Sequence, residues 1–205
     1  MNRKKFLFDQ DGAFGVKSFE RTSEQVATTM AGLRRKADIT LLRWQARFDS
    51  PIADRVIPWC GAFLLSLSLA LLSLSRFRDL SVGEQIGYYI QASHLMEMGE
   101  SPEITQIGLN IFALQAAWLF WPISLVARLF PTGEFLLTIQ ALSLGLAVVP
   151  IWRIARGPAN LRTGGAVVLV FAYSLHPSIH NLNLAGFHPE VVAIPALLAA
   201  YLSGH

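Results

Sequence analysis

The sequence predicts an all-α fold, a polytopic helical bundle embedded in a membrane. Hydrophobic residues make up 53% of the 205 residues and charged residues only 15%, whereas a soluble domain carries about 25% charged residues. Apolar runs recur along the chain, and several approach the roughly 20 residues that a helix needs to cross a bilayer. These runs lack the alternation of polar and apolar residues that transmembrane strands show, so the sequence favours helices over a closed barrel.

The region before the first apolar run is strongly basic. Residues 1–56 hold eleven of the seventeen Lys and Arg residues, and basic residues near the ends of spans stay in the cytoplasm. We therefore predict a cytoplasmic basic tail over residues 1–56. Within it, residues 19–49 predict a basic amphipathic helix that ends at Pro51. This helix either lies on an anionic membrane surface or is a solvated cytoplasmic helix.

The first predicted membrane span covers residues 57–75, which are rich in Leu, Ser and Ala. Arg55 precedes this span, and Arg76 and Arg78 follow it. The next segment, residues 79–106, contains five acidic residues and no Lys or Arg. Because basic residues mark the cytoplasmic side, we predict that this acidic loop is exoplasmic.

Residues 107–130 are apolar and aromatic, and their position in the membrane stays open. Trp118 and Trp121 lie in the middle of the run, although tryptophan prefers the membrane–water interface. Asn110 and Gln115 interrupt the run, and in lipid their polar groups need partners. The segment either spans the membrane or lies along its face as an interfacial helix.

Three further spans are predicted downstream, over residues 134–152, residues 164–182 and, incompletely, residues 190–205. Pro177 is expected to break or kink the second of these beside His176. The last one is too short to cross, so we expect the chain to be an amino-terminal piece of a longer protein.

The charge of one loop decides between the two positions of residues 107–130. Residues 153–162 contain three arginines and no acid, which favours the cytoplasm. If residues 107–130 lie flat on the outer face, the next span returns inward and this loop is cytoplasmic. The Phe187-His188-Pro189-Glu190 cluster then faces the same compartment as the acidic loop. We prefer this arrangement, which describes a multi-pass plasma-membrane protein with a cytoplasmic amino terminus.

Ionisable residues beside apolar segments point to a candidate site. His188 and Glu190 lie between two strongly apolar stretches, and such residues in or beside membrane spans default to a functional hypothesis. Glu84 in the acidic loop can act as a general base if its geometry suits. Tyr88 and Gln91 follow it and suit contacts with a sugar or a lipid head group. The alternative interpretation of the loop acids is that of solvated surface charges.

The sequence gives little support for a metal site or for a nucleic-acid-binding surface. His176 and His180 are four residues apart, which places them on one helical face, and His188 and Glu190 follow. These groups can hold a divalent metal, bridge to a phosphate or satisfy one another, and the sequence shows no tight metal signature. We therefore expect no metal or other cofactor. The basic tail lacks the interleaved aromatic residues of a nucleic-acid surface, so membrane lipids are the expected partners.

The motifs also resemble a known family over residues 83–203. The stretches that carry the resemblance are Gln85-Ile86-Gly87-Tyr88-Tyr89-Ile90-Gln91-Ala92, Gly108-Leu109-Asn110-Ile111-Phe112, Phe130-Pro131, Leu137, Gln140-Ala141-Leu142, Pro150-Ile151-Trp152-Arg153-Ile154-Ala155-Arg156, Ala172-Tyr173-Ser174-Leu175-His176-Pro177 and Phe187-His188-Pro189-Glu190. In order and spacing they resemble the uncharacterised bacterial membrane-protein family named domain of unknown function 2079. That family is similar to the GT-C type of polytopic glycosyltransferases. The first 56 residues lie outside the resemblance.

The resemblance implies a GT-C-like amino-terminal bundle with interfacial helices and a catalytic acid in the first outer loop. It also implies a polyprenyl-phosphate sugar as the donor and an acid that deprotonates the acceptor. The chain departs from the family pattern at two positions. Gln85 stands where an Asp is common and Gln115 where a His is common, and a glutamine cannot serve as a base. Either Glu84 substitutes by a shift of one residue, or this copy is catalytically impaired.

The resemblance thus implies a membrane glycosyltransferase-like protein that uses a lipid-linked sugar, and the charge pattern places the site on the exoplasmic side. Glu84 is the predicted catalytic residue. The predicted substrate-binding residues are His188, Glu190, Arg78, Tyr88, Gln91 and Asn110. His188 and Glu190 orient the lipid phosphate or the acceptor, and Arg78 offsets the phosphate charge. Two alternatives remain: a non-catalytic lipid-binding or transport-related membrane protein, and an inactive truncated fragment.

Overall fold

The computed structural model describes residues 32, 50–115 and 118–204, with the side chains of Leu114 and Gln115 outside the description. The predicted amphipathic helix over residues 19–49 therefore lies outside the described residues, apart from the single position 32. Residues 49–205 form one compact unit, and this unit is mostly helical, as the sequence predicts. The elements in chain order are α2 (Pro51–Arg78), α3 (Gln85–Glu97), β1 (Glu103–Ile104), β2 (Leu109–Asn110), α4 (Ile111–Gln115), α5 (Phe120–Ala127), α6 (Thr132–Leu146), α7 (Val148–Arg156), α8 (Thr163–Ser174), α9 (Pro177–Ala185), the 3-10 helix η1 (Pro189–Ala193) and α10 (Ile194–Ser203).

Among the described residues, two helical segments are long and apolar enough to cross a membrane, judged by length and composition. The first is α2, with 28 residues and a mean hydropathy of 2.0. Ser50 caps it, since its side-chain oxygen accepts from the Ala53 N–H at 3.2 Å, and Pro51 occupies the first turn, where no intrahelical N–H bond is needed. The second is the 25-residue segment Thr132–Arg156, formed by α6 and α7 with a mean hydropathy of 1.9. These two segments contain the predicted spans 57–75 and 134–152.

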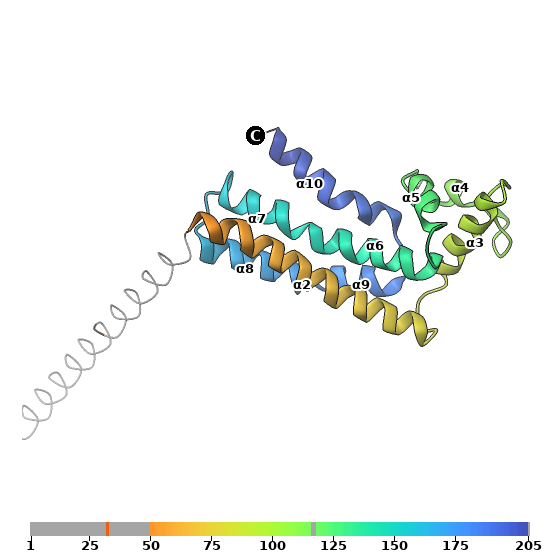
Figure 1. Cartoon of the computed structure of the whole chain (residues 1–205), viewed down its shortest axis with the longest axis horizontal. Helices are drawn as coiled ribbons and strands as arrows, with labels where there is room; N and C mark the ends of the chain where they lie inside the picture. Colours follow the sequence, from red (N-terminus) through yellow and green to blue (C-terminus); the bar gives the residue numbers. More distant parts are fainter. Residues whose placement is uncertain (1–31, 33–49, 116–117, 205) are drawn as a thin grey trace, which may run out of the picture. The chain divides into compact units, whose positions relative to one another are not determined.

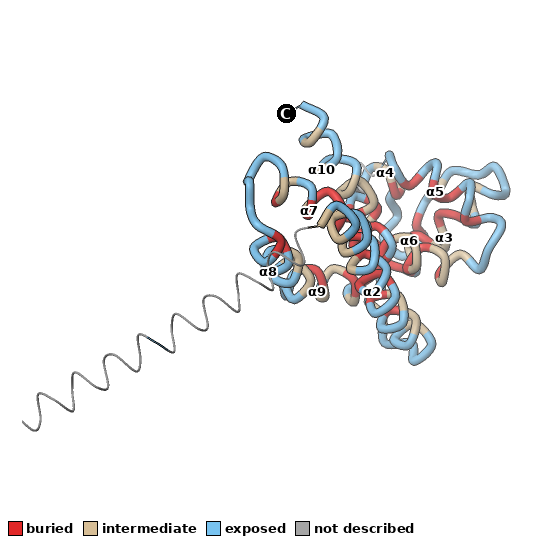
Figure 2. The backbone as a smooth tube through the Cα atoms, turned by 60° about the vertical axis from the view of Figure 1, so that its left-hand side comes forward, coloured by how far each residue is buried: buried red, intermediate tan, exposed pale blue. Residues whose placement is uncertain are grey.

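Helices α2 and α6–α7 pack side by side in opposite directions (Figure 1). Gly133 at the start of α6 lies against Phe77 near the end of α2. Midway along, a Cβ on Gly145 would lie 2.7 Å from both the Ala62 carbonyl oxygen and the Ser66 backbone nitrogen. Small residues at such a crossing let two helix backbones approach closely. The buried positions gather along α6 and the helices that face it (Figure 2).

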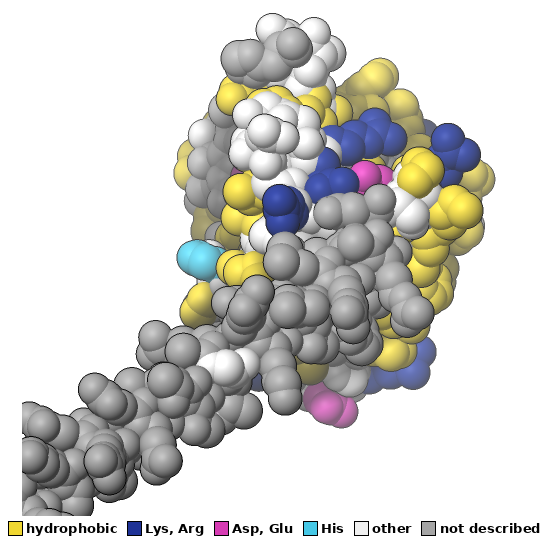
Figure 3. Space-filling model, turned by 90° about the vertical axis from the view of Figure 1, so that its left-hand side faces the viewer, with side chains coloured by type: hydrophobic (Ala, Val, Ile, Leu, Met, Phe, Trp, Pro, Cys, Tyr) yellow, Lys and Arg dark blue, Asp and Glu magenta, His cyan; other side chains and the backbone are white. Residues whose placement is uncertain are grey.

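An ion pair joins the end of α7 to the start of α2. The Arg156 guanidinium donates to the Asp54 carboxylate from Nε at 2.8 Å and from Nη2 at 2.9 Å. The Arg-rich loop 153–162 therefore lies at the same end of the unit as the start of α2. Basic side chains gather on this end, with an acidic side chain among them (Figure 3).

Reversing one charge of this pair should destabilise the bundle, and reversing both should restore part of the loss. A bidentate Arg–carboxylate bond is stronger than a single contact, but both side chains are partly exposed. We expect a coupling free energy of about 1 kcal/mol between Asp54→Arg and Arg156→Asp. Thermal unfolding of the two single variants and the double variant in detergent measures it. Strictly additive effects would contradict a direct pairing.

Residues 107–130 fold as short elements and not as one long helix, within the described positions 107–115 and 118–130. Strand β2 pairs with β1 in antiparallel register, with Glu103 opposite Asn110, and Gly108 turns the chain with a φ of 63°. Helices α4 and α5 follow, and with α3 they lie at one end of the long helices (Figure 1). We call residues 85–127 the cap. Its core includes the buried side chains of Tyr89, Ile104, Ile111, Phe120 and Ile123, and it also takes in Phe187.

The predicted span 164–182 is divided into two helices. Helix α8 ends at Ser174 and α9 begins at Pro177, with His176 as its N-cap at φ −64° and ψ 125°. A residue that precedes proline is pushed out of the helical region by the proline ring, which explains the break. The predicted segment 190–205 forms most of η1 and α10, and no residue of α10 is buried (Figure 2).

Candidate functional site

The candidate site is built on the turn that joins α9 to η1. Gly186 ends α9 with a φ of 147°, a backbone conformation that favours glycine. The next residue, Phe187, is fully buried. Its ring packs edge-on against Tyr89 of the cap, with 5.1 Å between ring centroids. The predicted cluster 187–190 therefore forms a tight turn that is anchored in the core of the cap.

A buried amide on α6 holds this turn in place. The Gln140 side chain is 0% exposed. Its Nε2 donates to the carbonyl oxygens of Leu182 at 3.1 Å and Gly186 at 2.9 Å. Its Oε1 accepts from the His188 backbone N–H at 2.6 Å. One side chain thus binds the last turn of α9, the glycine that ends it and His188, the N-cap of η1.

His188 and Glu190 contact each other, as their spacing allows. Nδ1 of His188 lies 3.2 Å from Oε1 of Glu190. The His188 side chain is only 14% exposed, whereas that of Glu190 is 62% exposed. The second ring nitrogen of His188, Nε2, is buried and has no hydrogen-bond partner among the described residues. Buried polar atoms are nearly always paired, so this atom is a candidate contact for a ligand.

The start of α3 packs against the same turn. A Cβ on Gly83 would collide with the carbonyl oxygen of Ala185, the last residue of α9. A Cβ on Gly186 would lie 3.4 Å from Cβ of Gln85. Glu84 is exposed and stands at the N-cap position of α3, where its side chain makes no capping bond. The structure therefore brings the segment Gly83–Gln85 and the turn together at one end of the bundle.

Tyr89 adds a phenol to this junction. Burial, and secondarily the negative charge of Glu190, raise the pKa of Tyr89 above its ordinary value. Both causes disfavour the phenolate, so the hydroxyl stays protonated at physiological pH. The negative charge of Glu190, the carboxylate that pairs with His188, therefore acts on the Tyr89 hydroxyl.

The other predicted binding residues have different surroundings. Gln91 donates from Nε2 to the Thr105 hydroxyl at 3.0 Å. Asn110 donates to Ser101 at 3.2 Å and accepts from the Phe112 N–H at 3.0 Å. These bonds hold the hairpin and the start of α4. Tyr88 is partly buried against the core of the cap, and Arg78 is exposed at the last turn of α2.

His176 and His180 serve the junction between α8 and α9. The Ser178 N–H donates to Nδ1 of His176 at 3.3 Å, and Nε2 of His180 lies 2.8 Å from the Ser174 carbonyl oxygen. The predicted span breaks beside His176, as expected from Pro177, so His176 caps α9 and His180 lies within that helix. In the part of the chain that the structure describes, no group of three or more His, Cys, Asp and Glu side chains is placed to hold a metal ion.

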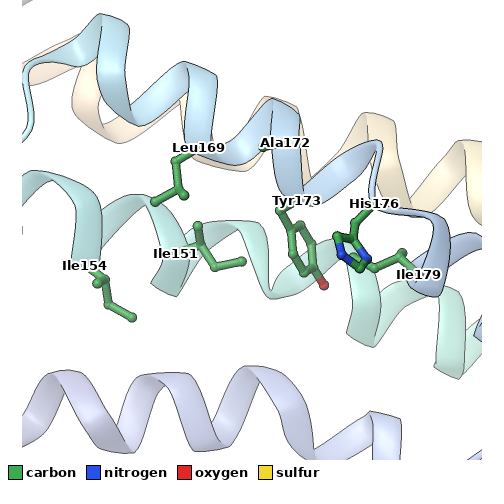
Figure 4. Close-up of a pocket in the computed structure, with 7 residues that line it drawn as sticks. All are labelled: Ile151, Ile154, Leu169, Ala172, Tyr173, His176 and Ile179. Carbon is green, nitrogen blue, oxygen red and sulfur yellow. The ribbon is translucent and has the colours of Figure 1, made fainter.

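An apolar groove of about 460 Å³ lies beside these helices. Figure 4 shows Ile151 and Ile154 of α7 facing it with Leu169 and Tyr173 of α8, and His176 next to Tyr173. Its lining is almost entirely hydrocarbon. The groove therefore suits apolar groups, and its polar side chains are those of Tyr173 and His176.

Gln140 is the residue whose role the sequence analysis missed. A signal was present, because Gln140 is a lone amide in the apolar run 134–152, and polar groups in such a run need partners. Nothing in the local pattern identifies the partners, which lie 42 to 48 residues further along the chain.

Comparisons with known proteins give one match. A family model described as a predicted membrane protein, DUF2079, matches residues 76–205. No curated protein and no solved structure matches the chain.

Proposed function

The chain belongs to the DUF2079 family of predicted membrane proteins, and on this premise we propose that it is a glycosyltransferase-like membrane protein that takes a sugar from a polyprenyl-phosphate carrier. The observation that carries the proposal is the junction between Gly83–Gln85 and the turn 187–190. There the backbone next to the exposed Glu84 packs against the end of α9. The turn that follows α9 carries the His188–Glu190 pair, and the buried Nε2 of His188 has no partner among the described residues. Convergent polar groups of this kind at one end of an apolar bundle are typical of a binding or catalytic site.

The packing of the helices supports an exoplasmic position for this site. The start of α2 and the Arg-rich loop 153–162 lie at one end of the bundle, joined by the Asp54–Arg156 pair. The cap and the turn 187–190 lie at the opposite end (Figure 1). Basic residues favour the cytoplasmic side, so the cap and the turn face outward in a multi-pass arrangement in the plasma membrane. The cap and the rest of residues 107–130 then lie along the outer face.

The proposed chemistry assigns one role to each charged group. The Glu84 carboxylate accepts the proton of an acceptor hydroxyl, whose oxygen then attacks the anomeric carbon of the sugar. The bond from that carbon to the lipid phosphate breaks, and the phosphate leaves with the electron pair. Arg78 offsets the phosphate charge, while His188 and Glu190 orient the phosphate or the acceptor. Gln85 takes no part as a base, since an amide cannot accept the proton.

Transfer and binding by the full chain in proteoliposomes test this proposal. With a polyprenyl-phosphate sugar, we expect Glu84→Gln to reduce transfer at least 100-fold with binding retained, within the range of a general base. We expect His188→Ala and Glu190→Ala to weaken both binding and transfer. Glu103→Gln, an exposed acid on the hairpin, is the matched control and should behave as wild type.

Two outcomes would contradict parts of the proposal. Wild-type transfer by both His188→Ala and Glu190→Ala would remove those residues from the site. Binding of the lipid-linked sugar without any turnover would favour a non-catalytic lipid-binding or transport-related protein. The presence of Gln85 beside the turn, where the family commonly has an acid, is the observation that favours this alternative.

A further inference from the structure

The Gln140 amide uses nearly all of its hydrogen-bonding capacity on one short piece of chain. Both Nε2 hydrogens go to carbonyl oxygens, those of Leu182 and Gly186, and one Oε1 lone pair receives the His188 N–H. Leu182 lies in the last turn of α9, where helix carbonyls have no intrahelical donor. The amide thus replaces the hydrogen bonds that the chain loses when α9 ends at Gly186.

These three bonds also fix the direction in which the His188 side chain leaves the backbone. With its N–H held by Gln140, His188 keeps an extended conformation, at φ −127° and ψ 96°. From this position its Nδ1 reaches Oε1 of Glu190 at 3.2 Å. A carboxylate accepts a hydrogen bond, so the proton of a neutral His188 lies on Nδ1. Its Nε2 then carries a lone pair, and this is the buried ring atom without a partner among the described residues.

We propose that Gln140 is a positioning residue: through the backbone of His188 it holds the ring in the Nδ1–H tautomer against Glu190 and presents the Nε2 lone pair to a ligand. The group that the turn offers is then a hydrogen-bond acceptor, which suits a hydroxyl. His188 was proposed to orient either the lipid phosphate or the acceptor. A hydrogen-bond acceptor at Nε2 favours the second role, contact with the hydroxyl of the acceptor substrate. That assignment rests on the proposed function, whereas the tautomer does not.

A purely structural role for Gln140 is the competing explanation, and a matched residue separates the two. Asn183 is also a buried amide, 1% exposed, and it also joins two helices. Its Nδ2 donates to the Leu69 carbonyl oxygen of α2 at 2.9 Å, so its bond does not reach the turn. Asn183→Leu should therefore loosen the bundle without altering the setting of His188.

The test uses the full chain in detergent with ¹⁵N-labelled histidine. The chain has five histidines, and His188→Gln identifies the His188 ring signals by their loss. In the wild type we expect two-bond ¹⁵N–¹H correlations of a single Nδ1–H tautomer. In Gln140→Leu we expect a mixture of tautomers, as for a solvated histidine. In Asn183→Leu we expect the wild-type pattern together with a lowered melting temperature.

A conservative variant keeps the proposal testable if Gln140→Leu does not fold. Gln140→Met keeps the length of the side chain but removes its three hydrogen bonds, so it too should give a mixture of tautomers. An unchanged tautomer in Gln140→Leu, or equal changes in Gln140→Leu and Asn183→Leu, would overturn the positioning role. Because no substrate is added, failure of the sugar-transfer assay leaves this result unaffected, and the reverse also holds.

Discussion

Gly145→Ala should strongly destabilise the helical bundle. The added Cβ would stand 2.7 Å from the Ala62 carbonyl oxygen and the Ser66 backbone nitrogen, and nearer still to the Ser66 hydroxyl. Two of these three atoms belong to the backbone of α2, so no side-chain rotation relieves the overlap. Helices α2 and α6 must separate along their most extensive interface. Forced overpacking costs about 1–3 kcal/mol in well-packed cores, and here it acts between α2 and the α6–α7 segment, the candidate spans among the described residues.

Thermal unfolding in detergent, followed by size-exclusion chromatography, measures the effect of Gly145→Ala. Gly87→Ala is the matched control, because Gly87 lies on α3 with no atom within 4 Å of an added Cβ. Alanine is also a better helix former than glycine, so this control should be neutral or slightly stabilising. A melting temperature for Gly145→Ala equal to that of the wild type would contradict the close packing of α2 on α6.

Gly83→Ala should disrupt the candidate site while leaving the long helices in place. Its Cβ would collide with the carbonyl oxygen of Ala185, a backbone atom at the end of α9. Since α9 is fixed there by Gln140, the start of α3 is the part that moves. Glu84 and Gln85 are displaced with it. We expect binding of the lipid-linked sugar to fall at least tenfold, which corresponds to about 1.4 kcal/mol.

Hydrogen–deuterium exchange provides a readout of Gly83→Ala that does not depend on the substrate. Exchange should rise in peptides covering residues 83–90 and 186–191, because both sides of the junction lose packing. Peptides from α2 and α6 should exchange as in the wild type, and Gly87→Ala should leave all regions unchanged. Unaltered protection on both sides of the junction would show that Gly83 does not hold α3 against the turn.

The sequence by itself determined the helical class and the placement of the two long apolar helices. The length of an apolar run, about 20 residues, is a local property of the sequence. So is the need of its backbone N–H and C=O groups for hydrogen bonds within the segment. They predicted the segments 57–75 and 134–152, which lie within α2 and α6–α7. The break beside Pro177 was also a local expectation, because proline acts on the residue before it. The cluster 187–190 stood out as polar residues between apolar stretches.

The local sequence pattern could not predict the structure of a segment, or the role of a residue, where tertiary packing decides between two alternatives. Residues 107–130 were compatible with a span or an interfacial helix, and the structure forms a hairpin and short helices there. Asn110 and Gln91 were predicted to bind substrate from their residue type, and their side chains hydrogen-bond within the hairpin region. Hydrogen-bonding groups of this kind suit either role, and only the neighbours decide which one a residue takes.

Only the tertiary structure assembled the site. Gln140 bonds to residues 42 to 48 positions away, Gly83 meets Ala185, and Asp54 pairs with Arg156 across 102 positions. Such contacts depend on how whole helices cross, and that crossing is set by small residues such as Gly145 far from the groups that are brought together. Spacing along the chain describes one helix or turn at a time, so it identifies the polar groups but leaves open which of them meet.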